Sequence, residues 1–171
     1  MKIALCGSGS EKNKEILEKA KEIGREIAKS NNILLTGGCK GNPYAALRGA
    51  ILENGKVICY SPASNKEEHI SKYNFPIEEN AEYIFTGKGI PGRNLPLIQN
   101  ADAVIIIGGQ IGTLNEFTIA FNENKKIGVL QGSGPLTELL PKIAEVCDKN
   151  GESKNIIYNN NPKELIKRMV S

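Results

Sequence analysis

Short apolar runs alternate along the chain with longer segments of helical periodicity. The apolar runs cover residues 2–7, 32–38, 56–62, 82–87, 101–109, 126–132 and 155–160. Their length and their β-branched residues are typical of strands, so the pattern predicts seven of them. The centre of the 101–109 run is apolar without alternation, as expected of a strand that is buried on both faces.

Between these runs, apolar residues recur with a period near 3.6, which predicts amphipathic helices. The clearest helix follows Ser10, its predicted N-cap, and places Ile16, Ile23 and Ile27 on one face. Further helices are predicted at about 43–54, 92–100, 113–124, 135–149 and 162–170. The polar segment 63–81 is predicted to form a short helix plus a loop.

The repeated order of strand, helix and strand predicts one domain over residues 1–171. Its expected fold is α/β, a Rossmann-like doubly wound and mostly parallel sheet of about seven strands with helices on both faces. Ligands of such sheets bind beyond the carboxyl ends of the strands, where the strand order reverses. Glycine-rich loops follow four of the predicted strands, at 6–10, 36–42, 86–94 and 108–116. Because glycine lets backbone N–H groups approach an anion, these loops favour a phosphorylated ligand.

Charge and hydropathy narrow the range of partners. The 22 Lys and Arg residues and 19 Asp and Glu residues give a net charge of +3 without a basic block. A DNA-handling protein on a related fold needs a basic patch, which this sequence lacks. No apolar run approaches the roughly 18 residues of a membrane span, and the first residues are too short for a signal-peptide core. The sequence therefore favours a cytoplasmic protein without membrane or nucleic-acid partners.

The cysteines and the single histidine do not form a metal motif. Cys6, Cys39, Cys59 and Cys147 lie far apart with no CxxC pair, and His69 is the only histidine. Reduced, buried thiols are expected, and no metal or cofactor is predicted. Cys39 follows a glycine turn, where either a reactive thiol or an inert small side chain would fit.

The loop CGSGS at 6–10 begins like a dinucleotide-binding GxGxxG motif. However, Lys12 stands where the third glycine belongs, and no acidic residue closes the second strand at Leu35-Thr36. No P-loop motif occurs either. Gly7 and Ser8 could still hold part of a nucleotide, or the loop could be a tight turn only.

The loop GGQIGTLNE at 108–116 carries more chemistry. A helix that starts near Thr113 would point the N–H groups of Gly112 and Thr113 at a phosphate. Glu116, one turn further on, is explained either by a functional role or by the helix dipole, which favours acidic residues in a first turn.

Arg93 and Asn94 are predicted to open the helix that precedes the 101–109 strand. An arginine at a helix start is poorly placed for the dipole and needs an anionic partner. Arg93 could reach the same crevice as Glu116 and bind phosphate there, or it could be a solvated surface residue.

On these residues the sequence resembles the Lonely Guy family of cytokinin-activating phosphoribohydrolases, long mislabelled as lysine decarboxylases. It is more similar to the bacterial and archaeal nucleotide-binding relatives of that family, and also to molybdenum-cofactor carrier proteins. The family motif is PGGxGTxxE, with an arginine eight residues before an ADA-like strand start, as Arg93 stands before Ala101. Residues 108–116 align over all nine positions, with Gly108 in place of proline, Gln110 in place of glycine and Asn94 in place of the usual lysine.

The resemblance implies hydrolysis of a purine nucleoside 5′-monophosphate to the free base and ribose 5-phosphate. Glu116 would stabilise the positive charge that builds on the ribose, and Arg93 would fix the substrate. The implied phosphate and ligand contacts are Gly109, Gln110, Gly112, Thr113, Asn94, Gly7, Ser8, Gly37 and Gly38. A non-catalytic carrier or sensor that holds a nucleotide or a molybdopterin-type phosphate is the alternative. No pyridoxal-phosphate lysine motif supports lysine decarboxylation.

The resemblance also implies a homodimer or a higher homo-oligomer. Relatives pack helices next to the active site, and the 113–124 helix offers Leu114, Phe117 and Phe121 for such a contact. The same residues could equally belong to the core.

Overall fold

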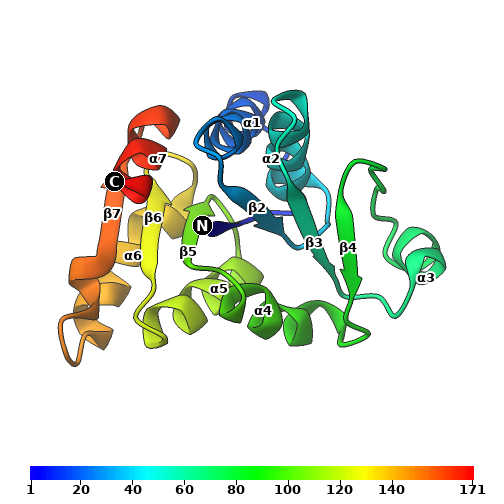
Figure 1. Ribbon diagram of the computed structural model, residues 1–171. Coiled ribbons are helices and arrows are strands. Elements are labelled where there is room, and N and C mark those ends of the chain that lie inside the picture. Colours follow the sequence, from blue (N-terminus) through cyan, green and yellow to red (C-terminus); the bar gives the residue numbers. More distant parts are fainter.

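The computed structural model describes residues 1–171, in which seven parallel strands form a single sheet (Figure 1). The strands are β1 (Lys2–Gly7), β2 (Ile33–Thr36), β3 (Val57–Ser61), β4 (Glu82–Phe85), β5 (Ala103–Ile107), β6 (Lys126–Leu130) and β7 (Ile156–Asn159). Their order in the sheet is β4-β3-β2-β1-β5-β6-β7, and every neighbouring pair is parallel. The order reverses between β1 and β5, so the predicted doubly wound fold is confirmed and its switch point lies between these two strands.

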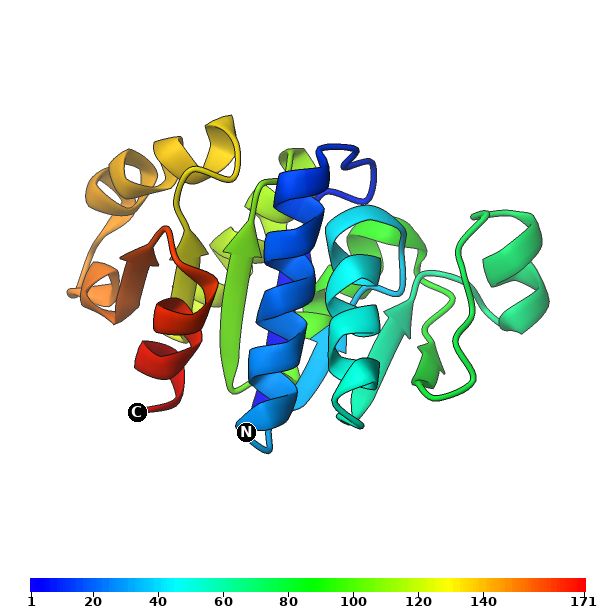
Figure 2. The same cartoon turned by 90° about the horizontal axis from the view of Figure 1, so that it is seen from above.

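Helices cover both faces of the sheet. One face carries α1 (Lys14–Lys29), α2 (Gly41–Leu52) and α7 (Pro162–Val170), which lie in front of the sheet in Figure 2. The other face carries α4 (Gly89–Gln99), α5 (Ile111–Asn122) and α6 (Pro135–Cys147), whereas α3 (Lys66–Ser71) lies beside β4 at the sheet edge. A short 3-10 helix (Glu152–Asn155) precedes β7. None of the helices combines the length and the hydrophobicity that a membrane crossing requires.

Each face of the sheet has its own apolar core. Ile3 and Leu5 of β1 point to the α1, α2 and α7 side, and the alternate residues Ala4 and Cys6 point to the α4, α5 and α6 side. All five residues of β5 are buried, as its non-alternating sequence predicted. Because a strand that is buried on both faces cannot shift register without exposing apolar surface, β1 and β5 provide a fixed frame for the loops that follow them.

Two glycines set the close packing of α1 on α2. A Cβ atom on Gly24 would lie 1.9 Å from the carbonyl oxygen of Ala46, and one on Gly49 would lie 1.9 Å from that of Lys21. Only glycine therefore allows the two helix backbones to approach this closely.

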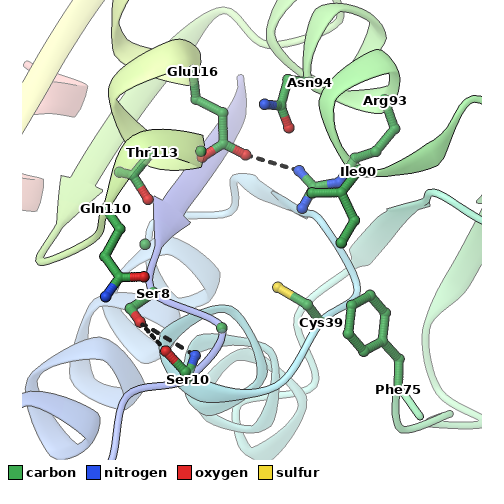
Figure 3. Close-up of a pocket in the computed structure, with 13 residues that line it drawn as sticks. Ser8, Ser10, Cys39, Phe75, Ile90, Arg93, Asn94, Gln110, Thr113 and Glu116 are labelled. Carbon is green, nitrogen blue, oxygen red and sulfur yellow. Dashed lines mark hydrogen bonds and ion pairs between the residues drawn. The ribbon is translucent and has the colours of Figure 1, made fainter. Parts of the chain in front are cut away.

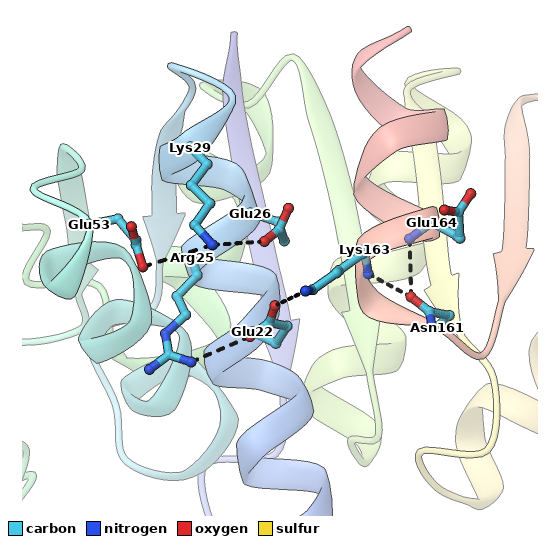
Figure 4. Close-up of polar contacts among 8 residues, drawn as sticks. All are labelled: Glu22, Arg25, Glu26, Lys29, Glu53, Asn161, Lys163 and Glu164. Atoms are coloured by element: carbon cyan, nitrogen blue, oxygen red, sulfur yellow. Dashed lines mark hydrogen bonds and ion pairs between the residues drawn. The ribbon is translucent and has the colours of Figure 1, made fainter.

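Surface ion pairs join the helices of this face but contribute little to its stability (Figure 4). Lys163 of α7 lies 3.4 Å from Glu22 of α1, and Lys29 of α1 lies 4.0 Å from Glu53 beyond α2. Both lysines are solvent-exposed, so each pair contributes about 0–1 kcal/mol. Asn161 caps α7 by accepting the backbone N–H groups of Lys163 and Glu164. Burial of the apolar face of α7 is the main force that holds this helix on the sheet.

Several predicted helix starts were wrong by a few residues. The N-cap of α1 is Asn13 rather than Ser10, because the side chain of Asn13 accepts the N–H of Glu15. The N–H of Ser10 is instead bonded to the hydroxyl of Ser8 in a local turn. Helix α4 begins at Gly89 and α5 at Ile111, both earlier than predicted, so Arg93 lies in the second turn of α4 rather than at its start. Glu116 lies in the second turn of α5.

Candidate functional site

A cavity of about 300 Å³ lies at the switch point, beyond the carboxyl ends of β1 and β5 (Figure 3). Eight of the eleven predicted site residues line it: Gly7, Ser8, Arg93, Asn94, Gln110, Gly112, Thr113 and Glu116. The β1, β5, α4 and α5 segments thus converge as the predicted topology required. Five lining residues had not been assigned to the site, namely Gly9, Ser10, Cys39, Phe75 and Ile90.

The start of α5 reaches the cavity with an open first turn. Its N-cap residue Gln110 is extended, and no side chain caps the helix. The first N–H groups of an α-helix have no partner within the helix, and the helix dipole adds a partial positive charge there. Gly112 and Thr113 carry two of these groups and line the cavity, so this helix start can bind an anion.

Glycines shape the loop before α5 from outside the cavity. Gly109 has φ +101°, and a Cβ atom there would lie 2.4 Å from Cβ of Thr113. It therefore lies beneath Thr113 and does not line the cavity, contrary to the prediction. The N–H of Gly108 donates to the hydroxyl of Ser133 at 2.8 Å, a buried bond that ties the loop to the segment after β6.

The loop before α1 reaches the same cavity, and the start of α1 beyond that loop is capped by a side chain of its own. Glu11 accepts the N–H groups of Lys12 and Asn13, and Asn13 accepts that of Glu15. The hydroxyl groups of Ser8 and Ser10 lie 3.2 Å apart at the cavity wall. This loop consequently offers hydroxyl groups to a ligand, whereas in the α1 first turn Asn13 already accepts the N–H group of Glu15.

Arg93 and Glu116 form a buried ion pair within the cavity wall. The Nη1 of Arg93 donates to Oε1 of Glu116 at 2.8 Å, and each side chain is 7% exposed. The interpretation of Arg93 as a solvated surface residue is therefore wrong. The helix dipole does not explain Glu116 either, because Glu116 lies beyond the first turn of α5, which holds no acidic residue.

Burial sets the protonation chemistry of this pair. It raises the pKa of the Glu116 carboxyl, and the charge of Arg93 offsets only part of that rise. Burial opposes the charge of Arg93, but the attraction of Glu116 prevails and raises the Arg93 pKa. Burial also raises the pKa of the neighbouring Cys6 thiol well above its ordinary value, and the negative charge of Glu116 adds to that rise. Glu116 is thus a buried carboxylate held by Arg93 and suited to accept a proton.

Gly37 and Gly38 support the site without lining the cavity. A Cβ atom on Gly37 would lie 2.1 Å from Nη2 of Arg93, so the guanidinium rests directly on the Gly37 backbone. Gly38 has φ +65° and faces Cys59 and His69, away from the cavity. The prediction that both glycines line the pocket was wrong, although Gly37 determines where Arg93 lies. The Nε of Arg93 is buried without a hydrogen-bond partner.

Asn94 joins the two helices that carry the ion pair. Its Nδ2 donates to Oδ1 of Asn115 at 2.8 Å, and its side chain lines the cavity next to Arg93. Where the related motif has lysine, this chain therefore has a neutral link between α4 and α5 in place of a second positive charge.

Two open alternatives from the sequence are resolved by burial. Phe117 is 1% exposed and Phe121 is 9% exposed, so both belong to the core and cannot form a surface contact. Leu114 is partly buried and packs against the same core cluster. Cys39 is buried, and burial raises the pKa of its thiol although Arg93 partly opposes this. The inert interpretation of Cys39 is thereby favoured.

The fold and the cavity together define a class of protein. It is a doubly wound α/β protein in which an uncapped helix start and a buried Arg–Glu pair share one cavity at the switch point. The chain belongs to the SLOG cluster4 family (LDcluster4), whose model matches residues 1–166. This confirms the resemblance to the Lonely Guy superfamily.

Individual relatives span most of the chain. An uncharacterized protein of Archaeoglobus fulgidus is 30% identical over 132 residues, 77% of this chain and 80% of that protein. A probable cytokinin riboside 5′-monophosphate phosphoribohydrolase of Oryza sativa subsp. japonica is 25% identical over 96% of this chain and 68% of its own. The structure of the molybdenum cofactor binding protein from Rippkaea orientalis is similar with a TM-score of 0.78 and 26% identity, covering 99% of this chain and 97% of the other.

Proposed function

We propose that the cavity binds a nucleoside 5′-monophosphate and that the protein hydrolyses its N-glycosidic bond, releasing the free base and ribose 5-phosphate. The observation that carries this proposal is the juxtaposition of an uncapped helix start with the buried Arg93–Glu116 pair in one cavity. Similarity to the rice phosphoribohydrolase over 96% of this chain supports it.

The phosphate binds at the start of α5. Gly112 and Thr113 contribute N–H groups there, and the side chains of Gln110 and Ser8 lie on the same side of the cavity. The α1 start is a poorer anion site, because Glu11 and Asn13 already accept the N–H groups of Lys12, Asn13 and Glu15. Glu11 also adds negative charge there. This asymmetry orients the ligand with its phosphate toward α5.

Glu116 then acts at the ribose. As the C–N bond breaks, its electron pair leaves with the base, and positive charge develops on the sugar ring, where the carboxylate stabilises it. The oxygen of a water molecule bonds to the anomeric carbon, Glu116 accepts the released proton, and the base takes up a proton to leave as the neutral free base. Arg93 keeps Glu116 in place and contacts the ribose beside it.

Product release from a panel of purine and pyrimidine nucleoside 5′-monophosphates tests this function, with base and ribose 5-phosphate quantified by chromatography. We expect Glu116→Gln to reduce the rate about 100- to 1000-fold, because it removes the charge that stabilises the transition state. Glu123→Gln, the same change just beyond the far end of α5 and exposed to solvent, is the matched control and should leave the rate unchanged. Absence of base release from every monophosphate contradicts the enzymatic proposal.

A second candidate function is a carrier or sensor that holds a nucleotide or a molybdopterin-type phosphate without cleaving it. Similarity to the cofactor binding protein of Rippkaea orientalis over 99% of this chain favours this alternative. In addition, Asn94 makes a neutral contact where the hydrolases have lysine. Native mass spectrometry of the purified protein distinguishes the two, because a carrier retains an intact ligand through a long incubation and a hydrolase does not.

We further propose that the protein is a cytoplasmic homodimer. Ile90 and Leu95 of α4 and Ile111 of α5 are exposed apolar residues next to the cavity, at 45%, 46% and 81% exposure, and they suit a contact with a second copy. Light scattering across a dilution series measures the mass, and a monomer at all concentrations refutes the dimer. Fractionation of expressing cells tests the location.

A further inference from the structure

The two sides of the cavity differ in chemistry, as Figure 3 shows. Ser8, Gln110 and Thr113 form a polar side near the starts of α1 and α5. Cys39, Phe75 and Ile90 form the opposite side, which carries no strong hydrogen-bonding group. The Arg93–Glu116 pair lies between the two sides. A ligand that fills this cavity therefore meets an anion site at one end and an apolar wall with one aromatic ring at the other.

One anchor of the Phe75 segment is the buried side chain of His69. The N–H of Phe75 donates to the backbone oxygen of His69 at 3.1 Å, and the two rings meet edge to face at 5.5 Å. The Nε2 of His69 lies 3.0 Å from the carbonyl oxygen of Pro76, which can only accept, so Nε2 carries the proton. The Nδ1 then accepts the hydroxyl of Ser61 at the end of β3, at 2.8 Å. His69 thus fixes Phe75 to the sheet.

The second anchor follows Phe75 in the chain. The carboxylate of Glu78 accepts the hydroxyl of Tyr44 at 2.6 Å and a nitrogen of Arg48 at 3.0 Å, both from α2. The backbone N–H of Glu78 donates to the hydroxyl of Tyr83 on β4 at 3.0 Å. Because the segment is held on both sides of Phe75, the ring is pre-positioned, and a ligand does not have to order it on binding.

We propose that Phe75 is the stacking surface for the planar heteroaromatic ring of the ligand, with Ile90 covering the rim of the same subsite. The proposal rests on the proposed function, because the phosphate bound at α5 directs the other end of the ligand toward Phe75. Stacking recognises the flat face common to all bases, and this wall has no polar groups that read base edges. The site therefore selects a phosphorylated ligand with any planar base over a sugar phosphate without one.

Calorimetric titration with two ligands tests the subsite. Carbocyclic AMP carries a base and has no glycosidic bond to hydrolyse, whereas ribose 5-phosphate carries the phosphate without a base. We expect Phe75→Ala to weaken carbocyclic AMP about 5- to 150-fold and ribose 5-phosphate less than about twofold, and Phe75→Tyr to restore binding. Phe85→Leu is the control, because Phe85 contacts His69 in the same aromatic cluster and does not line the cavity.

A spectroscopic arm makes the result independent of the alanine variant. The chain contains no tryptophan, so Phe75→Trp introduces a single reporter. Carbocyclic AMP should quench or shift its fluorescence, and ribose 5-phosphate should not. Equal effects of Phe75→Ala on both ligands, or no effect on either, overturn the subsite and leave the phosphate site standing. Failure of the wild-type protein to bind either ligand overturns the proposed function and, with it, this inference.

Discussion

The starts of α1 and α5 follow neighbouring strands through glycine loops that line the same cavity, yet only α1 has a side-chain cap. At α1, Asn13 caps the helix and Glu11 accepts the two preceding N–H groups. At α5, Gln110 occupies the N-cap position and no side chain caps the first turn. Of these two units of strand, glycine loop and helix, the one without a capping side chain is the better candidate for the proposed anion site.

The presence of a capping side chain at α1 and its absence at α5 also affect the stability of the two helices. A capping side chain contributes about 1 kcal/mol, which α1 gains and α5 does not. The α5 start is held in other ways, through the bond from Gly108 to Ser133, the contact of Gly109 with Thr113, and the buried ring of Phe117. These contacts all leave the first-turn N–H groups unused, so a bound phosphate would supply the missing cap.

The largest effect is expected from removing the support beneath the α5 start. Gly109→Ala forces a side chain into φ +101° and places its Cβ 2.4 Å from that of Thr113. We expect the free energy of unfolding to fall by about 2–4 kcal/mol, measured by urea denaturation, together with loss of phosphate binding. Gly112→Ala is the control for stability, because a Cβ there meets nothing within 4 Å. A Gly109→Ala protein as stable as the wild type would show that the contact with Thr113 is unimportant.

A smaller effect is expected from closing α5 in the way that α1 is closed. Gln110→Asp places a carboxylate at the N-cap, where it accepts first-turn N–H groups and repels phosphate. We expect ribose 5-phosphate to bind about tenfold more weakly while the free energy of unfolding rises by about 0.5–1 kcal/mol. Gln110→Asn caps without adding charge and should fall between the wild type and Gln110→Asp in titration calorimetry. Unchanged affinity in both variants places the phosphate elsewhere.

The smallest effect is expected from opening α1. Asn13→Ala removes the cap and should lower the free energy of unfolding by about 1 kcal/mol. Ligand affinity should not change, because Glu11 still occupies the adjacent loop N–H groups and Asn13 does not line the cavity. Urea denaturation and calorimetry of the same preparation measure the two quantities. A gain or loss of affinity would mean that the α1 start takes part in binding after all.

The strands were predictable because each one is a short apolar run between glycine loops and helical periodicity. The helix starts were less predictable, because two of the helices that line the cavity lack a capping residue. Helices α4 and α5 have no capping side chain at Lys88 or Gln110. A capping residue is the strongest local sign of a helix start, and it is absent from the two helices that carry Arg93 and Glu116.

The site was predictable where topology alone determines proximity. Loops after β1 and β5 must meet at the switch point, which brought Ser8 and Glu116 together, and α4, which precedes β5, adds Arg93. That Arg93 pairs with Glu116 depends on side-chain geometry that no spacing rule contains. Phe75 had no local signal, because its position is set by His69 and Glu78 through contacts with distant strands and helices.

The glycine beneath Arg93 has a consequence for how mutational data on this protein are interpreted. Gly37 touches no cavity surface, but any side chain there overlaps the guanidinium, with a Cβ only 2.1 Å from Nη2. We therefore expect substitutions of Gly37 to displace the guanidinium of Arg93 and to lower activity in a saturation map scored for function. Gly37 matters because it has no Cβ atom, which leaves room for the guanidinium of Arg93. A list of the residues that contact the ligand would not include it.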